Sequence, residues 1–150
     1  MKNVYWENFL AETGRDENTK CTWTVSFGMD REAADSAVEK VLRGEKTAMI
    51  YLENVYRLNM SAPSKPGDLH IICDWQQQPR AVVEVISVEK LALSGLTDEH
   101  CAREAEAKDL DAWKSLRLPI IKTEIEELGG ELADDTALIF ESFRLVYPGA

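Results

Sequence analysis

Apolar residues at helical spacing predict two amphipathic helices in the first third of the chain. The first covers residues 3–13 and stops at Gly14. The second is capped by Asp30 and ends at Gly44, because glycine adopts the left-handed backbone that terminates a helix at little cost. The two apolar stripes consist of Val4, Tyr5, Phe9 and Leu10, and of Ala34, Ala37, Val38, Val41 and Leu42. Each stripe predicts a helix face that packs on a core.

Extended, β-prone runs bounded by turn residues predict the strands. Pro66-Gly67-Asp68 forms a tight turn before one strand, and Gln76-Gln77-Gln78-Pro79 joins that strand to the next as a hairpin. Residues 57–65 are too broken for a regular element and predict a loop, whereas residues 91–96 continue a strand or bend away from it. Residues 22–27 predict a short extended piece within a loop. The predicted strands cover residues 47–55, 69–75, 81–88 and 136–147.

Two further helices are predicted between the hairpin and the last strand. Thr97 caps the first and Asp109 the second, which ends at Gly129-Gly130. Pro119 predicts a break inside the second helix, whose core-facing residues are Leu110, Trp113 and Leu116. Strands joined by hairpins, with helices gathered between them, predict an α+β domain whose sheet curls into a small β-barrel. A doubly wound parallel sheet is disfavoured, because the sequence lacks regular strand-helix alternation.

The length and composition predict one soluble domain over residues 1–150. A chain of 150 residues is long enough for one core and short for two. No apolar run reaches the length of a membrane span, and Glu7 and Asn8 interrupt the N-terminal stretch where a signal peptide needs an apolar core. We therefore expect a cytoplasmic protein without membrane contact.

The charge and cysteine content restrict the function. A net charge of -10 disfavours broad binding to DNA or RNA backbones and leaves a local basic pocket as the alternative. Cys21, Cys73 and Cys101 are odd in number and far apart, which predicts reduced thiols and no zinc site. His70 has no ligand partner at metal spacing. We expect neither a metal nor another cofactor.

Lys46 is the first candidate for chemistry. It lies between the cap at Gly44 and the strand that begins near Thr47, where a lysine is sheltered from solvent. Desolvation lowers the pKa of an amine and can make it a proton acceptor. The alternative is that Lys46 only neutralises the negative end of the helix dipole.

Four motifs, in this order, resemble the ASCH-domain family, named after activating signal cointegrator homology. Gly44-Glu45-Lys46-Thr47-Ala48 follows a helix, and Pro66-Gly67-Asp68 opens a strand. Cys101-Ala102-Arg103-Glu104-Ala105-Glu106 precedes Trp113, and Phe140-Glu141-Ser142-Phe143 lies near the end. The longer bacterial branch has roughly Gly-x-Lys-Thr-Ala-Thr, Pro-x-Gly-Asp, Ala-x-x-Glu-Gly-Glu and Cys-Glu-Arg-Phe. The resemblance implies a PUA-like barrel with a cleft beside it.

The resemblance also implies a site for a nucleoside or a modified RNA base. A small bacterial member of the superfamily removes the acetyl group from N4-acetylcytidine, and other members are reported as ribonucleases. In the amidohydrolase a lysine accepts the proton, a threonine three residues later is the nucleophile, and a glutamate on a later helix donates the proton. Lys46 and Glu104 match the lysine and the glutamate. The implied ligand contacts are Thr47, Met49, His100 and Arg117.

The chain departs from the family pattern at five positions. Met49 stands at the threonine position, and a thioether cannot attack an amide carbonyl. Ala105 replaces the family glycine, Arg117 a histidine, Phe140 a cysteine and Ser142 an arginine. Arg117 is an alternative anion contact for the missing arginine. Because a strand alternates its faces, the family geometry also requires the matched lysine to lie in the turn before the strand.

Simpler interpretations accompany these candidates. Glu104 lies four residues from both His100 and Lys108, the spacing of a surface charge network on a helix. The four tryptophans, Trp6, Trp23, Trp75 and Trp113, are predicted to be core residues rather than stacking platforms for bases. The rival function is a non-catalytic module that binds RNA or a protein partner. The sequence leaves the oligomeric state open.

Overall fold

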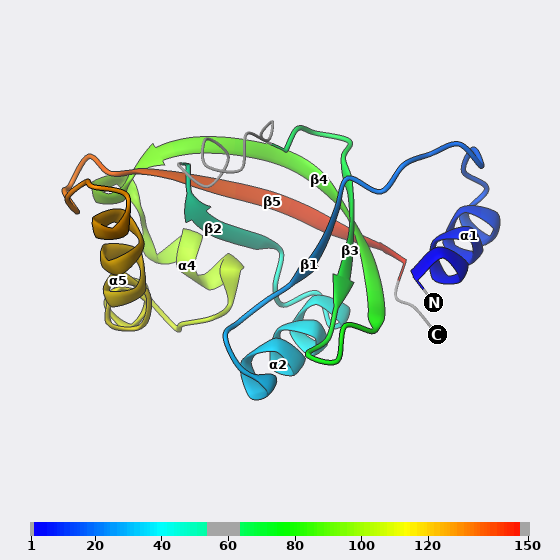
Figure 1. Ribbon diagram of the computed structural model, residues 1–150, viewed down its shortest axis with the longest axis horizontal. Coiled ribbons are helices and arrows are strands. Elements are labelled where there is room, and N and C mark those ends of the chain that lie inside the picture. Colours follow the sequence, from blue (N-terminus) through cyan, green and yellow to red (C-terminus); the bar gives the residue numbers. More distant parts are fainter. Residues whose placement is uncertain (1, 54–63, 148–150) are drawn as a thin grey trace. The chain divides into compact units, whose positions relative to one another are not determined.

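The computed structural model describes residues 2–53 and 64–147 (Figure 1). The predicted loop at residues 57–65 falls largely outside these ranges. The described helices are α1 Lys2–Thr13, α2 Arg31–Leu42, α4 Asp98–Glu104 and α5 Leu110–Glu127, with a short 3-10 turn at Leu93–Gly95. The described strands are β1 Trp23–Ser26, β2 Ala48–Leu52, β3 Leu69–Cys73, β4 Pro79–Ala92 and β5 Ala137–Tyr147.

The strands form one mixed sheet in the order β1-β3-β4-β5-β2. β1 runs parallel to β3, with Trp23 opposite His70. β3 pairs with β4, and β2 with β5, in antiparallel register, the latter with Ala48 opposite Ser142. Strands and helices are thus combined without regular alternation, which confirms the predicted α+β class.

The chain forms two compact units, each assembled from segments that are separate in the sequence. The first contains Met1–Thr47, Lys65–Ser87 and Phe143–Ala150, and the second contains Ala48–Ser64 and Val88–Ser142. Each unit has its own apolar core. The buried residues of the first core are Phe9, Leu10, Leu69, Ile71, Cys73 and Val82. Those of the second are Ala48, Ile50, Leu52, Leu93, Leu96, Cys101, Trp113, Ile121, Ile125, Leu138 and Phe140.

Within the first unit, local signals determine where α2 begins. Asp30 caps the helix by accepting a hydrogen bond from the amide of Ala33, as predicted. The preceding Gly28 has a φ of +79°, and a Cβ there would come within 2.6 Å of the Ala33 Cβ. Only glycine therefore fits this entry to the helix. In α1, Phe9 and Leu10 are buried as predicted, but Val4 is exposed.

Within the second unit, α5 passes through Pro119 without the predicted break. Proline removes one backbone donor from a helix. Trp113, Ile121 and Ile125 lie on both sides of it and are buried, so packing holds the helix together. Thr123 also donates its hydroxyl to the carbonyl of Pro119 at 3.0 Å.

The core-facing side of α5 differs from the predicted one by a single position. Leu116 is exposed, whereas Arg117 is mostly buried. Residues four apart on a helix lie nearly above one another, so Trp113 and Arg117 share a face. Arg117 therefore occupies the core-facing position that the sequence pattern predicted for Leu116.

Candidate functional site

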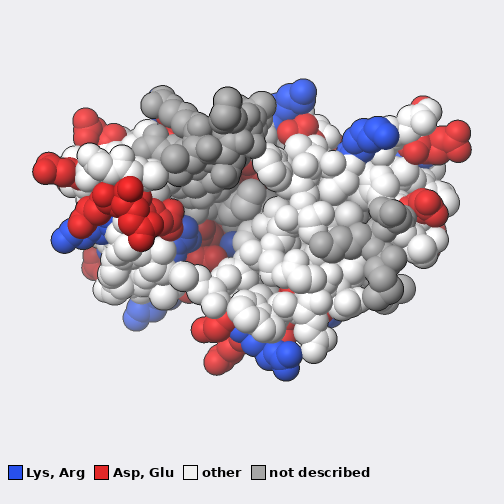
Figure 2. Space-filling view, in the orientation of Figure 1, with Lys and Arg blue, Asp and Glu red and all other residues white. Residues whose placement is uncertain are grey.

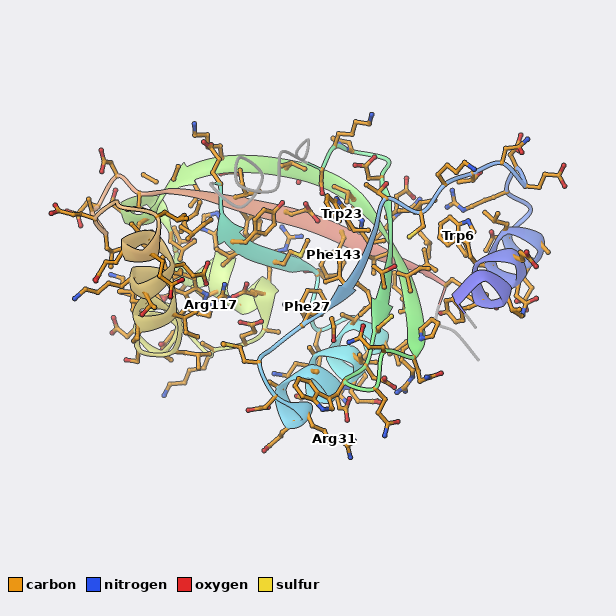
Figure 3. All side chains as sticks on the ribbon, in the orientation of Figure 1. Trp6, Trp23, Phe27, Arg31, Arg117 and Phe143 are labelled. Carbon is orange, nitrogen blue, oxygen red and sulfur yellow. The ribbon has the colours of Figure 1, made fainter. Side chains whose placement is uncertain are left out.

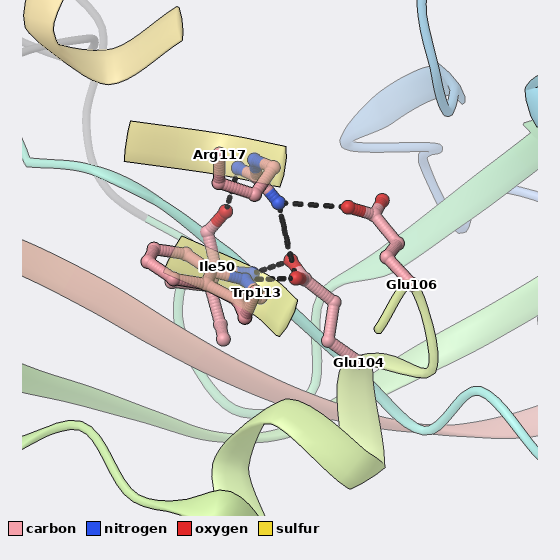
Figure 4. Close-up of polar contacts among 5 residues, drawn as sticks. All are labelled: Ile50, Glu104, Glu106, Trp113 and Arg117. Carbon is pink, nitrogen blue, oxygen red and sulfur yellow. Dashed lines mark hydrogen bonds and ion pairs between the residues drawn. The ribbon is translucent and has the colours of Figure 1, made fainter. Parts of the chain in front are cut away.

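The most polar buried feature of the second unit is centred on Glu104, the last residue of α4. Its side chain is 1% exposed, and both carboxylate oxygens accept hydrogen bonds (Figure 4). The indole of Trp113 donates to one oxygen at 2.7 Å, and the backbone amide of Ile50 donates to the other at 2.7 Å. The alternative of an exposed network is therefore wrong. Lys108 lies beyond the end of α4 and does not continue it.

Arg117 completes this feature from α5. Its NH1 nitrogen lies 3.0 Å from both oxygens of Glu104 and 2.8 Å from Glu106. Its NH2 nitrogen donates to the carbonyl of Ile50 at 2.8 Å, and its guanidinium lies 5.4 Å from the ring centre of Trp113. Burial lowers the pKa of Arg117, but the charges and hydrogen bonds of the two glutamates outweigh it, so the pKa is raised. Glu104 and Arg117 are thus brought together in an internal ion pair.

The backbone contacts of Ile50 lie at the edge of the sheet. β2 is the last strand in the order, and the amide of Glu53, the residue after β2, donates to the carbonyl of Ala137 in β5. Because alternate residues of a strand point their backbone groups in opposite directions, Ile50 points its amide and carbonyl away from β5. Glu104 and Arg117 satisfy this donor and this acceptor. The ion pair therefore occupies the edge where another strand would bind.

Ala105, the residue between Glu104 and Glu106, adopts a left-handed backbone conformation. Ala105 ends α4 with φ 61° and ψ 23°. The turn allows Glu104 and Glu106 to approach the same guanidinium. It also explains the family glycine at this position, since only glycine adopts this conformation without strain.

Replacing Ala105 with glycine is therefore expected to stabilise the protein. The relief of left-handed strain exceeds the extra chain entropy of glycine by roughly 0.5–1 kcal/mol. Urea unfolding would measure the change. Ala102→Gly is the matched control, because Ala102 is exposed inside α4 and the same change there costs about 1 kcal/mol. A lower free energy of unfolding for Ala105→Gly than for the wild type would contradict backbone strain at Ala105.

His100 is used in the cap of α4. Its Nδ1 accepts the backbone amide of Thr97 at 3.0 Å, and the hydroxyl of Thr97 faces the amide of His100. Its ring meets Phe140 edge-on, with centroids 4.6 Å apart. A ligand contact for His100 stays a prediction.

Met49 lies on the face of β2 that is opposite to the second core. It is half-buried and stands opposite Glu141 in the register, and Tyr51 lies two residues further on the same face. The hydroxyl of Tyr51 donates to Glu141 at 2.7 Å, and Glu141 is completely buried. Sequence reasoning gave no role to Glu141. Its only signal was its place in the Phe140-Glu141-Ser142-Phe143 motif.

Lys46 belongs to the first unit and lies before β2 begins, as predicted. Its side chain is only 2% exposed, and its ammonium is 4.5 Å from the ring centre of Phe27. Its backbone amide donates to the carbonyl of Lys40 at the end of α2, after Gly44 has adopted a φ of +77°. The predicted shelter of this lysine is confirmed. The neighbouring Thr47 is half-buried.

The tryptophans divide between core and surface. Trp113 is fully buried, and Trp6 packs against the first core. Trp23 and Trp75 are 38% and 43% exposed, so their prediction as core residues is wrong. Trp23 lies on β1, at the end of the strand order (Figure 3), and Trp75 follows β3 in a turn. Residues at such positions have fewer neighbours than residues of central strands.

Cys101 is predicted to be an unreactive thiol whose ionisation opposes folding. Burial, followed by the charges of Glu104, Asp98 and Asp109, raises its pKa to about 11, against the lowering effect of Arg117. The unfolded thiol has a pKa near 9. Because folding raises the pKa, the stabilisation is complete below pH 9 and is lost as the pH rises towards 11.

Urea unfolding of the wild type and of Cys101→Ala at several pH values between 8 and 11 would test this. The cavity cost of the alanine is independent of pH, so the wild type should lose more stability across this range than the variant. Equal losses of stability in the wild type and in Cys101→Ala would contradict the raised pKa of Cys101. The half-buried Cys21 should react with a thiol reagent before Cys101 does.

The described residues give no sign of a metal centre or of a membrane span. No group of three or more His, Cys, Asp or Glu side chains within residues 2–53 and 64–147 could hold a metal ion. No helix in these ranges is long and apolar enough to cross a membrane. On the face in Figure 2, the described Lys and Arg side chains are scattered among acidic and uncharged ones.

The sequence motifs and the fold identify the class of this protein as an ASCH domain. The family model described as "ASCH domain" matches residues 23–147, and the chain belongs to this family. It is similar to the ASCH domain from Lactobacillus crispatus JV V101, with 28% identity, a TM-score of 0.88 and coverage of 97% of this chain and 93% of that one. The predicted PUA-like ASCH fold is thereby confirmed.

A second solved structure is also similar. It is a protein from Enterococcus faecalis V583, with 25% identity, a TM-score of 0.83 and coverage of 97% of this chain and 87% of that one. No curated protein matches the chain.

Proposed function

We propose that this ASCH domain binds a nucleoside or a base of RNA and does not efficiently hydrolyse N4-acetylcytidine. Membership of the family supports this class of ligand, by resemblance. Met49 supports binding rather than chemistry, because its flexible apolar side chain can pack against a base or an acyl group but cannot attack a carbonyl.

The observation that carries the proposal is the hydrogen bonding of Glu104. A general acid must hold a proton that it can donate to the leaving amine. Trp113, Ile50 and Arg117 all donate to the Glu104 carboxylate, and an ionised carboxylate only accepts. In this arrangement the carboxylate that matches the family acid is used as an acceptor by three groups of the fold.

Titration of the wild type with a nucleoside panel tests the proposal. The panel contains cytidine, N4-acetylcytidine and the other common nucleosides, together with acetylated and plain RNA oligonucleotides. We expect saturable heat by calorimetry and no deacetylated product by chromatography. Met49→Ala should weaken binding several-fold, whereas Met29→Ala, at a methionine that is 75% exposed in the first unit, should not.

A second candidate function is the binding of a partner protein. Met29, Trp23 and Trp75 expose large apolar side chains on the first unit. Such residues are enriched at protein interfaces, and the net charge of -10 disfavours a polyanionic partner. Absence of any nucleoside or RNA binding by the wild type would overturn the first proposal and favour this one.

A further inference from the structure

We propose that Arg117 is a positioning residue. It holds Glu104 in place, and the two side chains together substitute for a neighbouring strand at the edge of β2. The arrangement is tested without any ligand.

The geometry at Ile50 reproduces what a neighbouring strand would offer. Its amide donates over 2.7 Å to Glu104, and its carbonyl accepts over 2.8 Å from Arg117. Both lengths are those of ordinary backbone hydrogen bonds. An unsatisfied buried backbone group would cost about 1–3 kcal/mol, so each of these two contacts stabilises the folded state.

Arg117 is the member that holds the arrangement together. The same NH1 nitrogen lies within 3.0 Å of Glu104 and of Glu106, while NH2 reaches Ile50. A planar guanidinium can make these contacts at once, whereas the single ammonium of a lysine cannot match their fork geometry.

Amide hydrogen exchange of Arg117→Met and Arg117→Lys would test the edge contact. We expect the Ile50 amide to exchange at least about tenfold faster in Arg117→Met, relative to the Glu53 amide, which pairs with β5. Arg117→Lys should be intermediate. If both amides accelerate equally, Arg117 stabilises the fold without positioning Glu104, and the inference is overturned.

Should Arg117→Met not fold, Arg117→Lys and Arg117→His carry the exchange measurement, with the same two outcomes.

Discussion

Replacing Arg117 with methionine is expected to lower the free energy of unfolding by about 3 kcal/mol. The methionine keeps much of the apolar stem but removes the charge, which leaves Glu104 buried without its guanidinium partner. Breaking a buried ion pair on one side costs about 3–5 kcal/mol, and the lower figure applies because Arg117 is 18% exposed. Urea unfolding at pH 7 measures the loss.

A surface ion pair provides the control. Arg144 contacts Glu84 at 2.8 Å, but its side chain is 62% exposed. Arg144→Met should therefore cost less than about 1 kcal/mol. The double variant Glu104→Gln, Arg117→Met should lose less than the sum of its single changes, because both changes disrupt the same ion pair. A loss below 1 kcal/mol for Arg117→Met would show that the pair does not stabilise the fold.

The combined variant Met49→Thr, Arg117→His is expected to gain hydrolysis of N4-acetylcytidine that the wild type lacks. The resemblance to the amidohydrolase implies the route: the threonine hydroxyl would attack the acetyl carbon, and the matched lysine, Lys46, would accept its proton. As the bond to N4 breaks, Glu104 gives N4 a proton, and water then releases acetate from the threonine ester.

Met49→Thr alone should gain only a small rate, because Arg117 still holds Glu104 as an acceptor. Adding Arg117→His should raise the rate on the order of a hundredfold or more, the usual contribution of general acid catalysis. Lys46→Ala or Glu104→Gln in the combined variant should abolish the gain. Chromatography of cytidine and acetate measures each rate, and circular dichroism confirms folding.

Two results would decide against this chemistry. Robust turnover by the wild type that survives Lys46→Ala would refute the transferred site. A folded combined variant with no gain would leave binding as the better explanation of Met49. Either result is independent of the stability loss expected for Arg117→Met.

Local rules were sufficient for the helix ends and for the shelter of Lys46. Asp30, Thr97 and Asp109 cap their helices as their side chains predict. Gly44 ends the turn after α2 in the left-handed conformation, and this places Lys46 before β2. Each outcome depends on groups only a few residues apart, so the sequence contains the necessary information.

Burial depends instead on which distant segments meet. Trp23 follows the pattern of a core residue, but the strand order puts β1 at an edge, where it is exposed. Pro119 should interrupt a helix, yet buried residues on either side keep α5 continuous. Hydrophobic periodicity predicts which side of a helix or strand faces a core, but it does not predict how much of that side is buried.

The α+β class, the family motifs and the positions of Lys46, Met49 and Glu104 within them follow from the amino-acid sequence. The burial and hydrogen bonding of Glu104 depend on long-range contacts. Its partners Arg117 and Ile50 are 13 and 54 residues away, and no local pattern links them. Because α5 presents Arg117 rather than Leu116 to the edge of β2, Glu104 became a buried acceptor instead of a surface charge.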